Sequence, residues 1–321
     1  MSGLMAVFWK ELADYFNSKR FIILSILVYL AGILTILVAA QNIRSMVSGG
    51  TSTVFIFLFL SAPEEFLQFF FRWLNLFISP FTLLFMLLIP FIGISFGIDS
   101  INSERTSGNL SRILSQPIYR DAVINGKFLA GLVAMSILIA SIVILVAGMG
   151  LRMIGVPPTA DEILRLFAFM FVSIIYGAFW MSIAVLFSVL FRSTTTSVLI
   201  SVILWVFFFV FAFFRIAGFI VPVEQSSGVD ALFQFEATYR MISRISPFYL
   251  YGEAVQILLM PFITTTNIAT MISRDIGTVN PLSLGRSLLI VWPQLATMIA
   301  LSALCFAGSY IKFMREEIRS T

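Results

Sequence analysis

Long uninterrupted apolar runs constrain this chain more than any other feature of its sequence. A helix needs about 20 apolar residues, each rising 1.5 Å, to cross the hydrocarbon core of a bilayer. Six stretches are long enough: Phe21–Ala40, Pro80–Ile98, Phe128–Leu151, Leu166–Phe191, Val198–Ile220 and Ser287–Ile311. None contains an acidic residue, and Arg215, near the end of the fifth stretch, is the one basic residue within them.

These runs predict an all-α polytopic membrane protein with six transmembrane helices, forming a single transmembrane domain over residues 1–321. In hydrocarbon every backbone N–H and C=O must be paired within its own segment, which a helix achieves. A β-barrel would show alternating segments of about ten residues instead. The chain is 60% hydrophobic and 11% charged, whereas soluble domains average roughly 25% charged residues, so lipid is the expected solvent.

Residue types that support most enzyme chemistry are scarce. The chain has no His and one Cys, Cys305, which excludes an internal disulfide, a zinc or iron–sulfur site, and catalysis by His or a Cys–His pair. It has no G-x-x-x-x-G-K-[ST] phosphate loop, since Gly126-Lys127 is followed by Phe128. We therefore expect no enzyme, no cofactor or metal bound by this chain, and no nucleic-acid partner at a net charge of only +4.

The distribution of basic residues predicts the orientation. With the N-terminus inside, the inner segments carry eleven of the 20 Lys and Arg residues, and all four Lys lie there: Lys10, Lys19, Lys127 and Lys312. The nine outer Arg residues are spread over a longer stretch and matched by nine acidic residues. The positive-inside rule then predicts a multi-pass protein of the plasma membrane with cytoplasmic N- and C-termini.

The first 20 residues predict an amphipathic helix in the cytoplasmic interface. Apolar residues recur at spacings of three or four, and charged residues occupy the other side. The apolar set is Leu4, Phe8, Leu12, Tyr15 and Phe16, opposite Lys10, Glu11, Asp14 and Asn17. The alternative is an ordinary basic flank that sets topology, and the two interpretations are compatible.

Two outer segments are long. Gln41–Ser79 is dense in aromatic residues and predicts an interfacial helix or a re-entrant pair, or simply Phe and Trp facing lipid headgroups. Residues 221–286 predict a surface helix over Asp230–Arg244 and a half-buried helix over Ser246–Leu259. This second segment is either an extracellular gate or a cap that packs the fifth and sixth spans.

The inner loop Asp99–Lys127 is polar, and its pattern is typical of a docking surface. Gly108 allows a sharp reversal, and Pro117 ends or bends a short helix. Between them Leu110, Ile113 and Leu114 recur at helical spacing, with Arg112 off that face. A short amphipathic helix at the membrane surface fits a groove in a cytoplasmic partner.

This loop resembles the signature of the type-two ABC exporter permeases. The matching positions are Glu104, Arg105, Gly108, Leu110, Leu114, Ser115, Pro117, Arg120, Gly126 and Lys127. The sequence differs at Ser111, where many relatives carry Glu. The opening FWKELADYFNSKRF resembles the interfacial helix of the same family, so the resemblance covers essentially the whole chain.

The resemblance implies how the chain would work. The inner loop would be a coupling helix seated in a separate ABC ATPase subunit, where the ATP binds, and two permeases, identical copies or paralogues, would pair with two ATPases. The residues implied in ATPase docking are Glu104, Arg105, Gly108, Leu110, Arg112, Ile113, Leu114, Pro117 and Arg120. Cargo would then be exported across the membrane, and charge-poor spans favour a hydrophobic or amphipathic cargo.

Other functions stay open to different degrees. An ion-coupled carrier normally places an acidic residue near the membrane midplane, and no span offers one. A signalling or scaffolding subunit with the same fold is not separable from a transporter by sequence. Sparse polar residues inside the spans predict bonds between helices, with cargo contact as the alternative. They are Ser173, Tyr176, Ser182, Ser188, Gln294 and Thr297.

Overall fold

The chain folds as a bundle of long helices. The structure, a computed structural model, describes residues 3–47, 80–106, 119–155, 157–213, 216–220, 229–259 and 282–315. Within these residues all regular structure is α-helical. The helices are α1 Gly3–Asn17, α2 Lys19–Val47, α5 Pro80–Thr106, α7 Arg120–Ile154, α8 Ala160–Leu190, α9 Thr194–Phe213, α10 Ile216–Ile220, α11 Val229–Ser243, α12 Pro247–Leu259 and α14 Leu284–Arg315.

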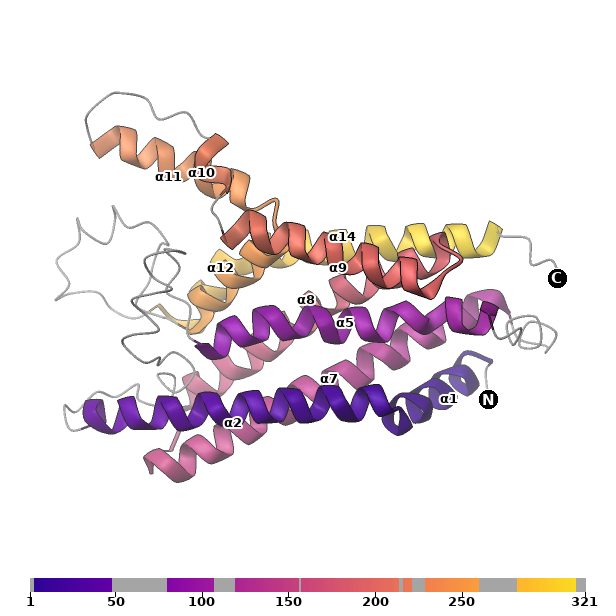
Figure 1. The fold of residues 1–321 in the computed structure, drawn as a ribbon. Coiled ribbons are helices and arrows are strands. Elements are labelled where there is room, and N and C mark those ends of the chain that lie inside the picture. The colour runs from indigo at the N-terminus through magenta and orange to yellow at the C-terminus, as the bar shows by residue number, and fades with distance from the viewer. Residues whose placement is uncertain are drawn as a thin grey trace.

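Six of these helices, α2, α5, α7, α8, α9 and α14, are long and apolar enough to cross a bilayer, which confirms the predicted number. Figure 1 shows them running side by side, with α1 and the end of α14 at one end of the bundle. The end of α5 and the start of α7 lie at this same end, here called the inner end, and the opposite end is called the outer end. That it faces the cytoplasm is a prediction from the charge distribution.

The break between α1 and α2 has a local cause. Ser18 separates the two helices, and its Oγ accepts the N–H of Phe21 at 3.1 Å while donating to the carbonyl of Tyr15 at 2.7 Å. A serine in this position satisfies one of the free donors that begin a helix. The chain therefore turns at Ser18, and α1 leaves the direction of the first span (Figure 1).

The reversal between α7 and α8 is equally well specified. Gly155 ends α7 in the left-handed region at φ 77°, where glycine is favoured. Thr159 then begins α8 through a capping box, accepting the N–H of Glu162 while the Glu162 carboxylate accepts the N–H of Thr159.

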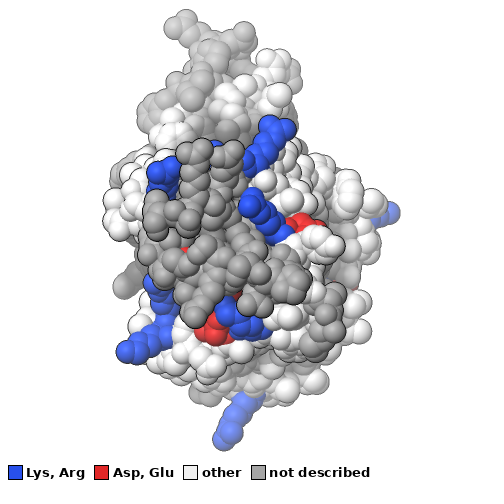
Figure 2. All heavy atoms as spheres, turned by 90° about the vertical axis from the view of Figure 1, so that its right-hand side faces the viewer, with Lys and Arg blue, Asp and Glu red and all other residues white. Residues whose placement is uncertain are grey.

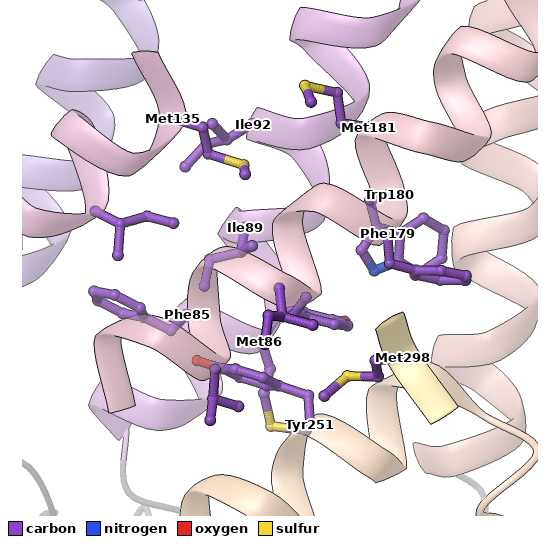
Figure 3. Close-up of a cluster of buried hydrophobic side chains, with 14 of the residues drawn as sticks. Phe85, Met86, Ile89, Ile92, Met135, Phe179, Trp180, Met181, Tyr251 and Met298 are labelled. Carbon is purple, nitrogen blue, oxygen red and sulfur yellow. The ribbon is translucent and has the colours of Figure 1, made fainter. Parts of the chain in front are cut away.

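The core of the bundle forms around α8, which packs against α5, α7, α9, α12 and α14. Two glycines of α5 allow its close approach to α8. A Cβ on Gly93 would lie 2.6 Å from the Gly177 carbonyl oxygen, and one on Gly97 would lie 2.6 Å from the Met181 carbonyl oxygen. Figure 3 shows the apolar side chains that meet here: Phe85, Met86, Ile89, Ile92, Met135, Phe179, Trp180, Met181, Tyr251 and Met298.

The outward faces of α2, α9 and α14 remain apolar. Exposed side chains on them include Ile22, Ile26, Leu30, Leu199, Ile203, Phe207, Leu289, Trp292 and Leu304. Water cannot solvate so large an apolar area, so these faces require hydrocarbon or another apolar surface.

At the outer end, α12 differs from its prediction. Residues 247–259 were expected to be half buried, but every one of them is buried, against α5, α8, α9 and α14. Glu253 is buried there as well, and the Arg244 guanidinium binds its carboxylate with both Nε, at 2.9 Å, and Nη2, at 2.8 Å. Neutralised in this way, Glu253 enters the protein interior.

Helix α11 lies where a surface helix was predicted and projects from the bundle (Figure 1). Of the outer segment Gln41–Ser79, only 41–47 is described, as the end of α2. The predicted interfacial helix or re-entrant pair there lies outside the described residues.

Candidate coupling site at the inner end

Helix α1 lies closely against the start of α7. Val7 and Leu12 are buried, whereas Trp9 is 55% exposed on the other side of α1. Gly126 of α7 makes the approach possible, since a Cβ there would lie 2.9 Å from Val7 Cγ1 and 3.2 Å from the Leu4 carbonyl oxygen. The Gly of the Gly126-Lys127 pair thus has a packing role.

Lys127 joins three helices at this contact. Its Nζ donates to Glu11 Oε1 of α1 at 2.8 Å and to Glu104 Oε1 of α5 at 2.8 Å. The Lys127 side chain is only 4% exposed. We call Glu11, Glu104 and Lys127 the inner triad.

Lys10 extends the inner triad toward solvent. Its Nζ lies 2.9 Å from Glu11 Oε1, 3.2 Å from Asp14 Oδ2 and 3.8 Å from Glu104 Oε1. Figure 2 looks onto the inner end, where Lys and Arg side chains outnumber Asp and Glu on the visible surface of the described residues. Three of the acidic side chains at this end, Glu11, Asp14 and Glu104, each lie within 4 Å of a lysine nitrogen.

Charge complementarity explains why these groups tolerate burial. Burial alone would raise the pKa of the Glu11 carboxyl, but the charge and hydrogen bonds of Lys127 and Lys10 outweigh it and hold this pKa below 4.5. Burial would lower the pKa of Lys10, and bonds to Glu11 and Asp14 raise it instead. A buried cation with two carboxylates avoids the cost of an unpaired charge.

Tyr15 adds an uncharged bond between α1 and α5. Its hydroxyl donates to the Phe96 carbonyl oxygen at 3.0 Å. Burial, together with the negative charges of Glu11 and Glu104, raises the pKa of Tyr15, so the phenol stays a neutral donor. The inner end of α1 is thus fixed by packing, by ions and by this hydrogen bond.

The predicted docking residues fall into two groups. Glu104 lies in the last turn of α5, with its side chain turned into the inner triad, and Arg120 is the first residue of α7. Arg105 belongs to α5, but its side chain is not described. The others lie outside the described residues: Gly108, Leu110, Arg112, Ile113, Leu114 and Pro117.

Sequence reasoning missed Glu11 and Lys10 as site residues. It placed both on the polar side of the predicted interfacial helix, but Glu11 pairs with a distant residue, since 116 residues separate it from Lys127. Lys10 lies near Glu104 of α5 as well as near its neighbours Glu11 and Asp14. One feature of the sequence pointed to the pairing of Glu11 with Lys127: Lys127 directly precedes the predicted third span, and a lysine that is buried needs a carboxylate as its partner.

Most polar residues within the spans bond to neighbouring helices, as predicted. Ser173 pairs with Tyr251 at 2.9 Å, and Tyr176 donates to the Met86 carbonyl oxygen at 3.3 Å. Ser182 pairs with Ser302 at 2.9 Å. Thr297 instead donates within its own helix, to the Pro293 carbonyl oxygen at 2.8 Å.

At the outer end, Arg165 of α8 is a buried cation that joins several helices, as Lys127 does at the inner end. It is 1% exposed and binds Asp161, the carbonyl oxygens of Leu258 and Leu282, and Ser287 Oγ. One guanidinium thereby joins α8 to the end of α12 and the start of α14. Among the described residues there is no cluster of three or more His, Cys, Asp or Glu suited to a metal ion.

Residues 5–318 match the sequence profile of the family described as ABC-2 family transporter protein. The chain belongs to this family. No curated protein matched the sequence. The ABC-2 match extends from α1 to beyond α14, so it includes most of α1, the inner triad and the six candidate spans. An ABC-2 membrane component carries no ATPase domain of its own, and the chain is such a multi-pass component.

Proposed function

We propose that this ABC-2 chain is the permease of an ATP-driven exporter, and that a separate ABC ATPase binds the loop between α5 and α7. The inner triad is the observation that carries this proposal. Glu104 lies in the last turn of α5 and Lys127 is the eighth residue of α7, so their 2.8 Å ion pair joins the two helices that flank the loop. A loop built in this way can pass a force to the helices on both sides.

The proposed transmission follows the contacts. A displacement of the loop moves the end of α5 and the start of α7 together, because Glu104 and Lys127 are bonded. Glu11 extends this unit to α1, which leads directly into the first span. Separating a buried ion pair typically costs about 3–5 kcal/mol, so the unit resists being pulled apart during such a movement.

Export, the docking residues and the stoichiometry belong to the same proposal. Leu110, Ile113 and Leu114 would enter a groove of the ATPase, with Arg112 and Arg120 fixing the register. Two permease copies, or a copy and a paralogue, would assemble with two ATPases. The apolar outward faces of α2, α9 and α14 supply surface for lipid and for the second permease.

The test is purification of the tagged chain from its native membranes, followed by reconstitution. We expect an ABC ATPase with a phosphate loop to co-purify and its ATP hydrolysis to respond to the permease. Hydrolysis measured across a panel of lipids and drugs would identify the cargo class.

Two loop variants make the test specific. Leu110→Asp or Ile113→Asp should abolish co-purification while membrane insertion is kept. Met314→Asp is the control, since Met314 is an exposed apolar residue at the inner end of α14, a different helix from the two that flank the loop. Normal ATPase binding by the loop variants would contradict the docking site, and a chain that recovers no ATPase would contradict the function.

A further inference from the structure

A second polar cluster, formed by Asn102, Ser188 and Ser197, binds the inner end of α5 on a different face from the inner triad. Asn102 Nδ2 donates to Ser197 Oγ at 2.8 Å, and Ser188 Oγ accepts the backbone N–H groups of Ile101 and Asn102, each at 3.2 Å. Asn102, Ser188 and Ser197 are 0% exposed. Residues two apart in a helix face different neighbours, so Asn102 and Glu104 contact different helices.

The bonds to Ser188 involve the backbone of α5. An N–H inside a helix normally donates to the carbonyl four residues earlier. Here two consecutive N–H groups also lie within reach of a hydroxyl from α8, an arrangement by which a side chain enters the helical hydrogen-bond ladder. The end of α5 is therefore held to α8 by its main chain.

Ser197 brings α9 into the same cluster. Its hydroxyl accepts from Asn102 and lies 3.0 Å from the Phe187 carbonyl oxygen and 3.2 Å from that of Ser193. Phe187 belongs to the last turn of α8, and Ser193 precedes α9. The Ser197 hydroxyl therefore bonds both to α5 and to the residues on either side of the short turn 191–193.

We infer that Asn102, Ser188 and Ser197 are positioning residues for coupling, which make the α8–α9 turn move together with the base of the docking loop. This inference rests on the proposed function. Apolar packing between helices has no direction and permits sliding, whereas hydrogen bonds fix one register. The last two turns of α5 then pass a displacement to α1 and α7 through Glu104, and to α8 and α9 through Asn102.

The test uses the full complex of the chain with its ATPase in lipid. Spin labels are placed at Arg192, which is exposed in the turn, and at Met314 of α14, in a Cys305→Ser background. The change in their distance on adding ATP and vanadate is measured beside the ATP hydrolysis rate. No knowledge of the cargo is required.

Four variants are compared with the unmodified chain. Asn102→Leu and Ser188→Ala remove the bonds, and Ser188→Thr keeps the hydroxyl. Ser309→Ala is the control, because Ser309 is equally buried but bonds only to the Cys305 carbonyl oxygen of its own helix. With ATP and vanadate, the ratio of complexes at the ATP-induced distance to complexes at the resting distance should fall by roughly fivefold in Asn102→Leu, which loses one hydrogen bond, and by at least as much in Ser188→Ala, which loses two. Hydrolysis should continue, and Ser188→Thr and Ser309→Ala should behave as the unmodified chain.

The outcomes are separable. The inference is overturned if Asn102→Leu and Ser188→Ala show the same ATP-induced distance change as the unmodified chain. This holds even if their unfolding temperatures are lower, because the residues would then serve stability alone. If Asn102→Leu does not yield a folded complex, the contrast between Ser188→Ala and Ser188→Thr decides. Failure of the unmodified chain to bind an ATPase or to respond to ATP instead refutes the proposed function on which the inference rests.

Discussion

Lys127 Nζ lies 2.8 Å from Glu104 Oε1 across the base of the loop between α5 and α7, inside a contact that leaves the lysine 4% exposed. The same nitrogen is 2.8 Å from Glu11 Oε1. Three helices that are distant in sequence therefore share one cation. The buried Lys127 and its two carboxylates therefore join α1, α5 and α7 at the inner end.

Removing the cation should destabilise the fold strongly. Lys127→Met leaves Glu11 and Glu104 buried beside each other, and we expect the free energy of unfolding to fall by about 3–5 kcal/mol. Denaturant unfolding in detergent measures this. In a double-mutant cycle with Glu104→Gln, the two changes should be non-additive by about 0.5–3 kcal/mol.

Lys312→Met provides the matched control, since Lys312 is an exposed lysine in the last turn of α14 at the same end. Equal losses for Lys127→Met and Lys312→Met would show that the inner triad contributes nothing.

Gly126 should be required for the seating of α1. In Gly126→Ala the new Cβ would lie 2.9 Å from Val7 Cγ1, so α1 must shift away from α7. Gly148 lies in the same helix with no atom within 4 Å, and Gly148→Ala should stabilise by about 0.5–1 kcal/mol. Hydrogen exchange in α1 should rise only in Gly126→Ala, and Val7→Ala should restore it. Similar exchange in both glycine variants would argue against the close contact.

The packing of α5 on α8 should depend on Gly93. A Cβ at this position would lie 2.6 Å from the Gly177 carbonyl oxygen, and a backbone atom cannot rotate away. Gly93→Ala should therefore cost about 1–3 kcal/mol, as overpacking does. Thermal unfolding followed by circular dichroism checks this against Gly285→Ala, whose Cβ would meet nothing within 4 Å. A stabilised Gly93→Ala would contradict the geometry.

Arg165 should matter more than its acidic partner. Arg165→Met leaves the buried carbonyl oxygens of Leu258 and Leu282 without the guanidinium, at about 1–3 kcal/mol for each group that loses its bond. Asp161 is 54% exposed, so Asp161→Asn should cost less than about 1 kcal/mol. Unfolding temperatures of the two variants give the comparison, and a larger effect of Asp161→Asn would refute it.

Acid should weaken the inner end through Glu11. The folded-state pKa of Glu11 lies below the ordinary 4.5, so its stabilising effect is fully present above pH 4.5 and is lost as pH falls through the folded value. The unfolding temperature of the unmodified chain should therefore drop more steeply below that pH than the unfolding temperature of Glu11→Gln. Parallel curves would mean that Glu11 carries no such linkage.

The spans could be predicted because hydrocarbon leaves a chain few choices. The length of the apolar runs and their lack of charge determined the number of spans. Where a helix is longer than its apolar run, the additional residues are mostly polar ones at its end, as in α5, which continues to Thr106. Pairings between distant residues were not predictable in this way. Nothing in the local pattern of Glu11 indicates Lys127, and nothing within α12 indicates that Arg244, which precedes the helix, pairs with Glu253.

The separation between Glu11 and Lys127 also orders the assembly of the protein. Glu11 is synthesised 116 residues before the lysine that neutralises it, so α1 cannot complete its contacts until the helix beginning at Arg120 has entered the membrane. A chain that inserted this helix upside down would carry Lys127 to the opposite side of the bilayer and leave two carboxylates without their cation. Correct insertion of the third span is thereby a condition for the seating of α1.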